Sequence, residues 1–233
     1  KMAVNISKQA GNESSVSNEA VDKAKQIWSK NGKNIVLFLG VLIVAISGYL
    51  AYNQFVKGPK RAEALDKSFK AEEYYRMDSI HLALNGDGVN PGFIKIADSY
   101  GSTPTGNLAR YYAGICYIKL NQNDKAVQYL EDFSTDSKQI QHRAYLLLGD
   151  AYGDLGKGSK ALDYYKKAAH HFESDQQASS EALFRGAYLA QHVLNSKDEA
   201  IELYKELKEK YPRTQQGFEA DKYLAQLGVY NVN

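Results

Sequence analysis

The sequence predicts an all-α protein in which one apolar helix precedes an α-solenoid of helical hairpins. The 233 residues contain only four prolines, the first at Pro59, which leaves long stretches free to form helices. Beyond residue 60, apolar residues recur at helical spacing, and no strand-like alternation persists for more than a few residues. In the second half of the chain, a pattern of glycine, aromatic residue and alanine repeats at a nearly fixed interval.

An uncharged apolar segment predicts a transmembrane helix over residues 35–56. No charged residue lies between Lys33 and Lys57, and the stretch from Ile35 to Tyr52 would cover about 27 Å as a helix, close to the hydrocarbon thickness of a bilayer. A polar stretch precedes it and no small-x-small site follows, so we interpret it as an uncleaved signal anchor. The alternative is a buried helix of a soluble protein.

Two small residues four positions apart, Ser47 and Ala51, predict a helix-packing surface within this segment, with lipid exposure as the alternative. Residues 1–20 are too polar to bury a core and predict a disordered tail, followed by a short juxtamembrane segment, 21–34. Lysine and arginine are almost equally frequent on the two sides of the span, so charge bias leaves its orientation open. The net charge of +2 gives no reason to expect nucleic acid as a partner.

Residues 57–233 are predicted to form the repeat domain. It opens with an amphipathic helix that Asn85–Gly88 ends. The apolar positions of that helix are Ala62, Leu65, Phe69, Tyr75, Ile80 and Leu84.

The internal repeat is visible in three copies. Gly114 is followed by Ala126 and Leu130, and the same spacing recurs in the next copy. The second copy has Gly149, Ala161 and Tyr165, and the third has Gly186, Ala200 and Tyr204 with two extra residues after the glycine. Small residues allow two antiparallel helices to approach closely, and the large residues fill the space between them. Each hairpin alone leaves an apolar face exposed, so neighbouring hairpins must stack into a solenoid.

The repeats are expected at about 107–141, 142–176 and 179–213, with a closing cap helix at 214–228. The turns of the first two hairpins are predicted at Asn121–Asp124 and Gly153–Gly158. Residues Phe93–Tyr100 predict the second helix of a degenerate upstream copy.

Glycine, an aromatic residue three positions later, alanine nine after that and a final Tyr211-Pro212 resemble tetratricopeptide repeats, whose usual period is about 34 residues. By that resemblance, the first helix of each hairpin lines a concave groove that binds protein partners. Inter-repeat core is the alternative role for these side chains. The predicted groove residues are Leu108, Tyr111, Ile115, Ile118, Arg143, Leu146, Asp150, Asp154, Leu183 and Ala187.

The stretch Ile27–Lys33, the apolar helix and the repeats resemble, in this order, the YfgM-type ancillary subunit of the bacterial Sec translocon. This resemblance implies a protein of the bacterial inner membrane with a cytosolic N-terminus and a periplasmic repeat domain. The partners implied are a SecYEG-type translocon, a membrane-anchored prolyl-isomerase chaperone and newly exported client proteins. An envelope-assembly scaffold and an organelle import receptor with cytosolic repeats are the alternatives.

No arrangement of residues with catalytic spacing occurs in the sequence, so we expect neither an enzyme nor a cofactor. The five histidines are scattered, and the adjacent His170 and His171 point to different sides of a helix, which disfavours a shared metal. A single cysteine, Cys116, excludes an intramolecular disulfide.

Overall fold

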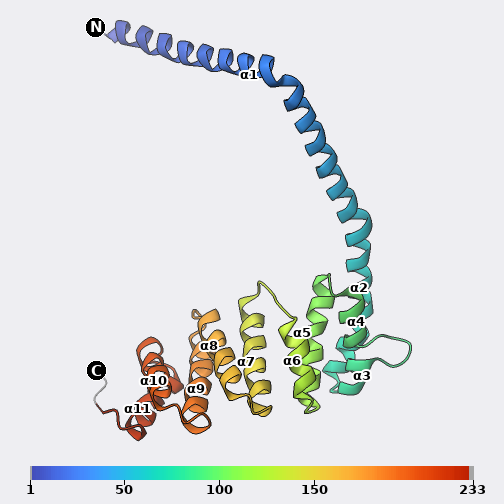
Figure 1. The fold of residues 1–233 in the computed structure, drawn as a ribbon, viewed down its shortest axis with the longest axis vertical. Coiled ribbons are helices and arrows are strands. Elements are labelled where there is room, and N and C mark those ends of the chain that lie inside the picture. Colours follow the sequence, from blue (N-terminus) through green and yellow to red (C-terminus); the bar gives the residue numbers. More distant parts are fainter. Residues whose placement is uncertain (1, 231–233) are drawn as a thin grey trace. The chain divides into compact units, whose positions relative to one another are not determined.

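The computed structural model describes the backbone of residues 2–230 and the side chains of residues 21–230, apart from Ala24. The chain divides into two compact units at the Pro59–Lys60 bond. Within residues 2–230, every regular element is a helix, and the only β-type pairing is an isolated antiparallel bridge between Gly86 and Pro91 (Figure 1). The prediction of an all-α protein is therefore confirmed for the described residues.

The first unit consists of α1 (Met2–Tyr52) and a π-helical turn, η1 (Asn53–Lys57). In the part of the chain that is described, one helical stretch is long and apolar enough to cross a membrane, and its most apolar window has a mean hydropathy of 2.4 with no residue buried. Ser47 and Ala51 are exposed within it. Their role in helix packing stays a prediction.

Helix α1 begins at Met2, so it runs through both the predicted tail, 1–20, and the predicted juxtamembrane segment, 21–34. Lys1 lies outside the described residues. Because an α-helix satisfies its own backbone hydrogen bonds, it can continue where no other element packs against it. Disorder of the tail in solution stays a prediction.

The described residues of the second unit form ten helices, of which the first begins two residues before the boundary. Their bounds are α2 (Gly58–Arg76), α3 (Ile80–Asn85), α4 (Phe93–Tyr100), α5 (Pro104–Lys119), α6 (Asn123–Glu131), α7 (Lys138–Asp154), α8 (Gly158–His171), α9 (Gln176–His192), α10 (Lys197–Lys210) and α11 (Gln215–Gln226).

The amphipathic helix predicted at the start of this unit differs from α2 in the face that it buries. Leu65 and Phe69 are 64% and 65% exposed, whereas Ala64, Ser68 and Ala71 are buried. Ala71 belongs to the core that α3, α4 and α5 share, whereas Leu65 and Phe69 lie outside it. The helix also ends earlier than predicted, at Arg76, before Asp78 with its positive φ of 55°.

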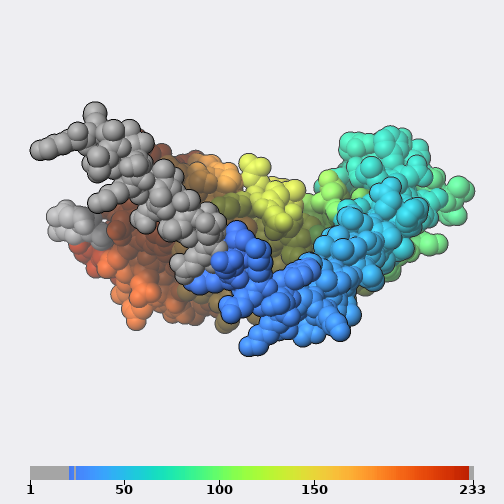
Figure 2. Space-filling view, turned by 90° about the horizontal axis from the view of Figure 1, so that it is seen from above, coloured from blue at the N-terminus to red at the C-terminus, as the bar shows by residue number. Residues whose placement is uncertain are grey.

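From α4 to α11, each helix packs against the next one along the chain, which forms the predicted solenoid (Figure 1). In the space-filling view of Figure 2, the green, yellow and orange parts of the second unit follow one another in the order of the chain. The repeat glycines lie where two helices of a hairpin meet: a side chain at Gly114 would collide with Leu130, and one at Gly149 with Tyr165. Asn121 and Gly156 adopt positive φ in the turns at the predicted places.

A second pattern, absent from the sequence-based predictions, occurs at the start of α5 and at the start of α11. The Thr103 hydroxyl accepts a hydrogen bond from the Gly106 backbone N–H at 3.0 Å and donates one to the Tyr100 carbonyl at 2.7 Å. The same bonds recur around Thr214, with the Gly217 N–H at 3.1 Å and the Tyr211 carbonyl at 2.9 Å. The spacing Tyr-x-x-Thr-x-x-Gly therefore marks the start of α5 and of α11.

In both copies the glycine is required, since a Cβ at this position would overlap the carbonyl oxygen of the tyrosine. Helix α4, which spans Phe93–Tyr100 as predicted, ends in the first copy, and α10 leads into the second. Helix α4 thus occupies the place of a second repeat helix, upstream of the first complete hairpin.

Candidate protein-binding groove

The predicted groove residues of the first hairpin lie on α5. Tyr111 is 8% exposed, with its ring centroid 5.1 Å from that of Phe133, and the other three, Leu108, Ile115 and Ile118, are half-buried against the core of the second hairpin. These four side chains therefore join neighbouring hairpins, and three of them keep part of their surface accessible.

On α7, Arg143 is exposed and Leu146 is half-buried. Burial raises the pKa of the Tyr111 phenol, and Arg143 partly offsets this rise, so Tyr111 and Arg143 lie close together across α5 and α7. Leu146 packs against the second and third hairpins at once. The structure thus brings the predicted residues of the first two hairpins onto adjacent helices.

Asp150 is the centre of a polar cluster that links three helices. Its carboxylate accepts two hydrogen bonds from Arg185 Nη1, at 2.8 and 3.0 Å, and a third from the Tyr165 hydroxyl at 2.7 Å. Arg185 also bonds Glu181 Oε1 through Nη2 at 2.6 Å. Burial and the bond to Asp150 raise the pKa of the Tyr165 phenol. The charge of Asp150 is therefore already paired inside the protein.

Asp154 ends α7 and is exposed, and its Oδ2 accepts a bond from the Asn123 side chain at 3.1 Å. It therefore connects the first hairpin to the second near the hairpin turns. No direct bond joins it to Asp150 among the described residues.

The prediction is wrong for the third hairpin. Leu183 and Ala187 are 1% and 0% exposed and belong to the core between α9 and its neighbours, so a partner cannot reach them. Helix α9 is packed on two sides by α8 and α10. The positions three before and one after its repeat glycine, Gly186, therefore lie on a buried face. This repeat is also the one with two extra residues between its glycine, Gly186, and its alanine, Ala200.

The accessible side of α9 carries a different set of residues, which we call the α9 face: Glu181, Phe184, Arg185, Tyr188 and His192. The ring centroids of Phe184 and Tyr188 are 6.2 Å apart, and those of Tyr188 and His192 are 4.2 Å apart. The spacing of three or four positions between aromatic and charged residues is the sequence signal that would have identified this face.

A hollow of about 220 Å³ opens beside the α9 face. It is lined by Tyr165, Phe184, Arg185, Tyr188, Leu189 and Val193. Tyr188 is 46% exposed and Val193 is 61% exposed, so the rim of the hollow is apolar and accessible. Aromatic and aliphatic side chains around a shallow hollow can hold an apolar side chain of a partner.

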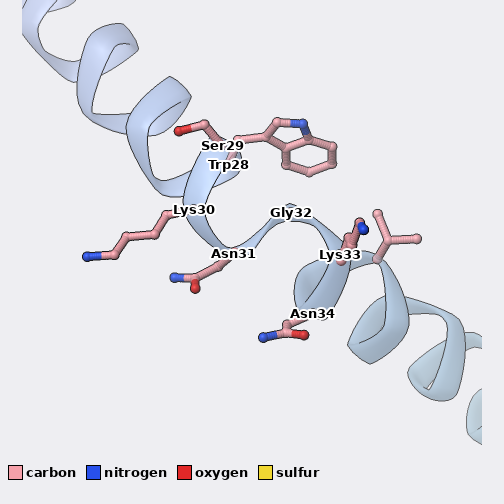
Figure 3. Close-up of a pocket in the computed structure, with 8 residues that line it drawn as sticks. Trp28, Ser29, Lys30, Asn31, Gly32, Lys33 and Asn34 are labelled. Carbon is pink, nitrogen blue, oxygen red and sulfur yellow. The ribbon is translucent and has the colours of Figure 1, made fainter.

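Larger hollows occur elsewhere on the chain. One of about 410 Å³ lies over α4, α5 and α6 and is lined by Ala97, Asp98, Arg110, Gln128, Tyr129 and Asp132. Figure 3 shows one along α1, lined by the consecutive residues from Trp28 to Asn34 and by Val36. All its walls come from one helix, so no second element encloses a ligand. It therefore gives no candidate site, despite its size.

Among the described residues, the metal-ligating side chains do not gather at one place. Among them, no group of three or more metal-ligating side chains could hold a metal ion. Cys116 is fully buried, and burial raises the pKa of its thiol to about 12, so it is a poor nucleophile. His142 is also buried, with Nδ1 2.8 Å from the carbonyl oxygen of Ala168.

A family model agrees with this architecture. Residues 108–136 and 181–214 match the family described as tetratricopeptide repeat. These matches cover α5 with α6 and α9 with α10. Comparison with curated proteins gives no significant match.

A solved structure of TPR-like repeats from a Podosopora anserina protein described as a kinesin light chain resembles the chain at 15% identity, with a TM-score of 0.35. The likeness covers 72% of this chain and 94% of the other.

Together, the family matches, the stacked hairpins and the glycines between their helices identify the fold. Two segments of the chain match tetratricopeptide repeats, a class of repeat that generally mediates protein–protein binding.

Proposed function

We propose that this protein is a membrane-anchored, non-catalytic scaffold whose repeats bind protein partners through the α9 face and the adjoining residues of α5 and α7. The observation that carries the proposal is the accessible aromatic hollow beside Tyr188, which adjoins the ion pair between Arg185 and Asp150. Because Asp150 and Arg185 satisfy each other, a charged partner group would have to displace an existing ion pair. Apolar side chains of an extended or helical partner segment suit this surface better.

The more specific proposal is an accessory role at the bacterial Sec translocon. The stretch before the apolar helix, the helix itself and the repeats behind it follow the order of parts of the YfgM-type subunit. In this role the repeats would stand in the periplasm, and they would contact a SecYEG-type channel, a prolyl-isomerase chaperone and newly exported proteins. The apolar window of α1, with no buried residue, supports anchoring in the membrane.

Membrane topology is the first test of this role. Protease added to intact spheroplasts should digest the repeats and leave a short protected fragment that contains the apolar helix. Protection of the repeats would refute a periplasmic domain and favour the import-receptor alternative.

The second test identifies the partners. Purification of the full chain in mild detergent should recover translocon subunits, as detected by mass spectrometry. Recovery of envelope-assembly proteins without channel subunits would instead support the scaffold alternative.

The binding surface is tested separately by substitution. Tyr188→Asp places a charge in the apolar rim without touching the core, so crosslinking to partners should fall at least about tenfold while the helical circular dichroism stays unchanged. Val89→Asp is the matched control, because Val89 is 90% exposed in the loop after α3. Unchanged crosslinking of the Tyr188→Asp variant would exclude the α9 face as the site.

A further inference from the structure

The last helix, α11, is a structural copy of α5. Both begin after the same Tyr-x-x-Thr-x-x-Gly junction. Each residue of α11 is therefore equivalent to the residue of α5 that lies 111 positions earlier, which is the distance from Thr103 to Thr214. Gly114 on α5 therefore corresponds to Ala225 on α11, and Asn107 corresponds to Phe218. If another repeat helix packed on α11 as α6 packs on α5, equivalent positions of α5 and α11 would face equivalent neighbours.

Helix α5 is covered on two sides, whereas α11 is covered on one. Helices α4 and α6 both pack against α5, and Gly114 lies under Leu130 of α6. Helix α11 packs against α10 and α9 through its buried residues Gly217, Ala220 and Leu224. Among the described residues of the second unit, no helix covers the side that corresponds to the α6 side of α5.

The uncovered side, which we call the α11 face, has a large apolar residue at one end and a small residue at the other. Phe218 is 83% exposed, the highest exposure of any large apolar residue on the repeat helices. Ala225 is half-buried, one helical turn from Asp221 and Lys222, which are both exposed. These four residues lie within one stripe of the helix, since they are spaced at three, four and seven positions.

This stripe is complementary to itself. If two α11 helices pair antiparallel about a point between positions 221 and 222, position 218 of one helix faces position 225 of the other, and position 221 faces position 222. Each Phe218 then packs over the small Ala225 of the second copy, as Leu130 packs over Gly114 within the first hairpin. Each Asp221 meets Lys222 of the second copy, so both charges are matched at once.

We infer that the α11 face is a homodimer interface, in which α11 of a second copy takes the place that a following second repeat helix would occupy. Asp221 also forms an ion pair with Lys208 of α10, with 2.9 Å between Nζ and Oδ1, and it remains 64% exposed on the side chain. It can therefore keep this contact and accept Lys222 of the second copy. The dimer is independent of the binding role proposed for the α9 face.

The proposed interface is small, so we expect the two copies to bind each other weakly. One pair of short helices buries less than the roughly 1,200 Å² that marks the lower end of stable interfaces, so the association is weak in solution. Confinement of two chains to one membrane would raise their effective concentration and favour the dimer.

A charge exchange on the full chain in mild detergent tests the register directly. Asp221→Lys alone and Lys222→Asp alone each place like charges opposite one another, so sedimentation velocity should show the dimer dissociation constant rising about tenfold. The double variant D221K/K222D restores both pairs across the dimer and should return the constant to near the wild-type value. It does not restore the bond to Lys208, so rescue cannot come from the stability of the monomer.

The apolar contact has its own matched pair of variants. Phe218→Asp should abolish dimerisation, whereas Phe69→Asp, at a similarly exposed phenylalanine on α2, should leave it unchanged. A chain that stays monomeric throughout, a double variant that fails to recover, or equal effects of the two phenylalanine variants would each overturn the inference. Dimers that survive all α11 variants would place self-association elsewhere, such as the apolar helix, and would also overturn it.

Discussion

Helices α5 and α11 start in the same way and end in different surroundings. Each begins with a threonine that caps the helix and a glycine that lies against a tyrosine carbonyl. Helix α5 is then enclosed by α4 and α6, whereas α11 has neighbours on one side only among the described residues. The local sequence thus sets how a repeat helix begins, and the next element along the solenoid sets whether its second face becomes core or surface.

The largest expected difference between the two helices is in thiol reactivity. Cys116 on α5 is fully buried with a pKa raised to about 12, whereas a cysteine introduced at the half-buried Ala225 on α11 would keep part of its surface exposed to solvent in the monomer. At pH 8, the raised pKa alone reduces the thiolate fraction of Cys116 by about a thousandfold. Maleimide labelling of the Ala225→Cys variant, followed by mass spectrometry of the two peptides, measures this ratio.

In this experiment, labelling at Cys116 should become fast after denaturation. A labelling rate for Cys116 in the folded chain within about tenfold of that at position 225 would show that α5 is not enclosed as described.

The next effect concerns stability. Gly114→Leu inserts a side chain where Leu130 already fills the space, so overpacking should lower the free energy of unfolding by about 3 kcal/mol. Ala225→Leu makes the equivalent change on the uncovered face and should alter it by less than about 0.5 kcal/mol. Thermal unfolding followed by circular dichroism, at concentrations where the chain is monomeric, gives both values.

Equal destabilisation by these two leucine variants would mean that the α11 face is covered within a single chain. That outcome would also remove the basis for a dimer at this face.

The smallest effect should be shared by both helices. Thr103→Ala and Thr214→Ala each remove the side-chain acceptor for a backbone N–H, and each should cost about 1 kcal/mol of unfolding free energy. Serine at either position keeps the hydroxyl and serves as the control. The same denaturation measurement checks them, and a loss confined to Thr103→Ala would show that the junction before α11 is frayed.

Several features of the fold could be predicted because they depend on local chemistry. The helix Phe93–Tyr100 and the cap helix beginning after Thr214 were predicted at their observed places, since apolar spacing and capping residues act within one or two turns. The positive φ of Asn121 and Gly156 follows from residue types that tolerate that conformation. The candidate membrane span follows from apolar length alone.

The binding surface could be predicted only in part. The spacing from Gly114 selected residues of α5 that adjoin the next hairpin, and their role in binding stays a prediction, whereas the same spacing from Gly186 selected the buried Leu183 and Ala187. A helix packed on two sides has apolar residues around most of its circumference, so periodicity no longer separates core from surface. On α2, the periodicity predicted burial of Leu65 and Phe69, but the small residues Ala64 and Ser68 beside them are buried instead.

By itself, the sequence determined that the chain is helical, where its hairpins turn, that it repeats, and that one segment is apolar enough to span a membrane. Only the tertiary structure decided which faces remain accessible, such as the side of α9 that carries Tyr188 and the side of α11 that carries Phe218. Secondary structure depends on neighbours along the chain, whereas exposure depends on which helices stack against each face. In a solenoid, the packing of neighbouring hairpins decides that stacking.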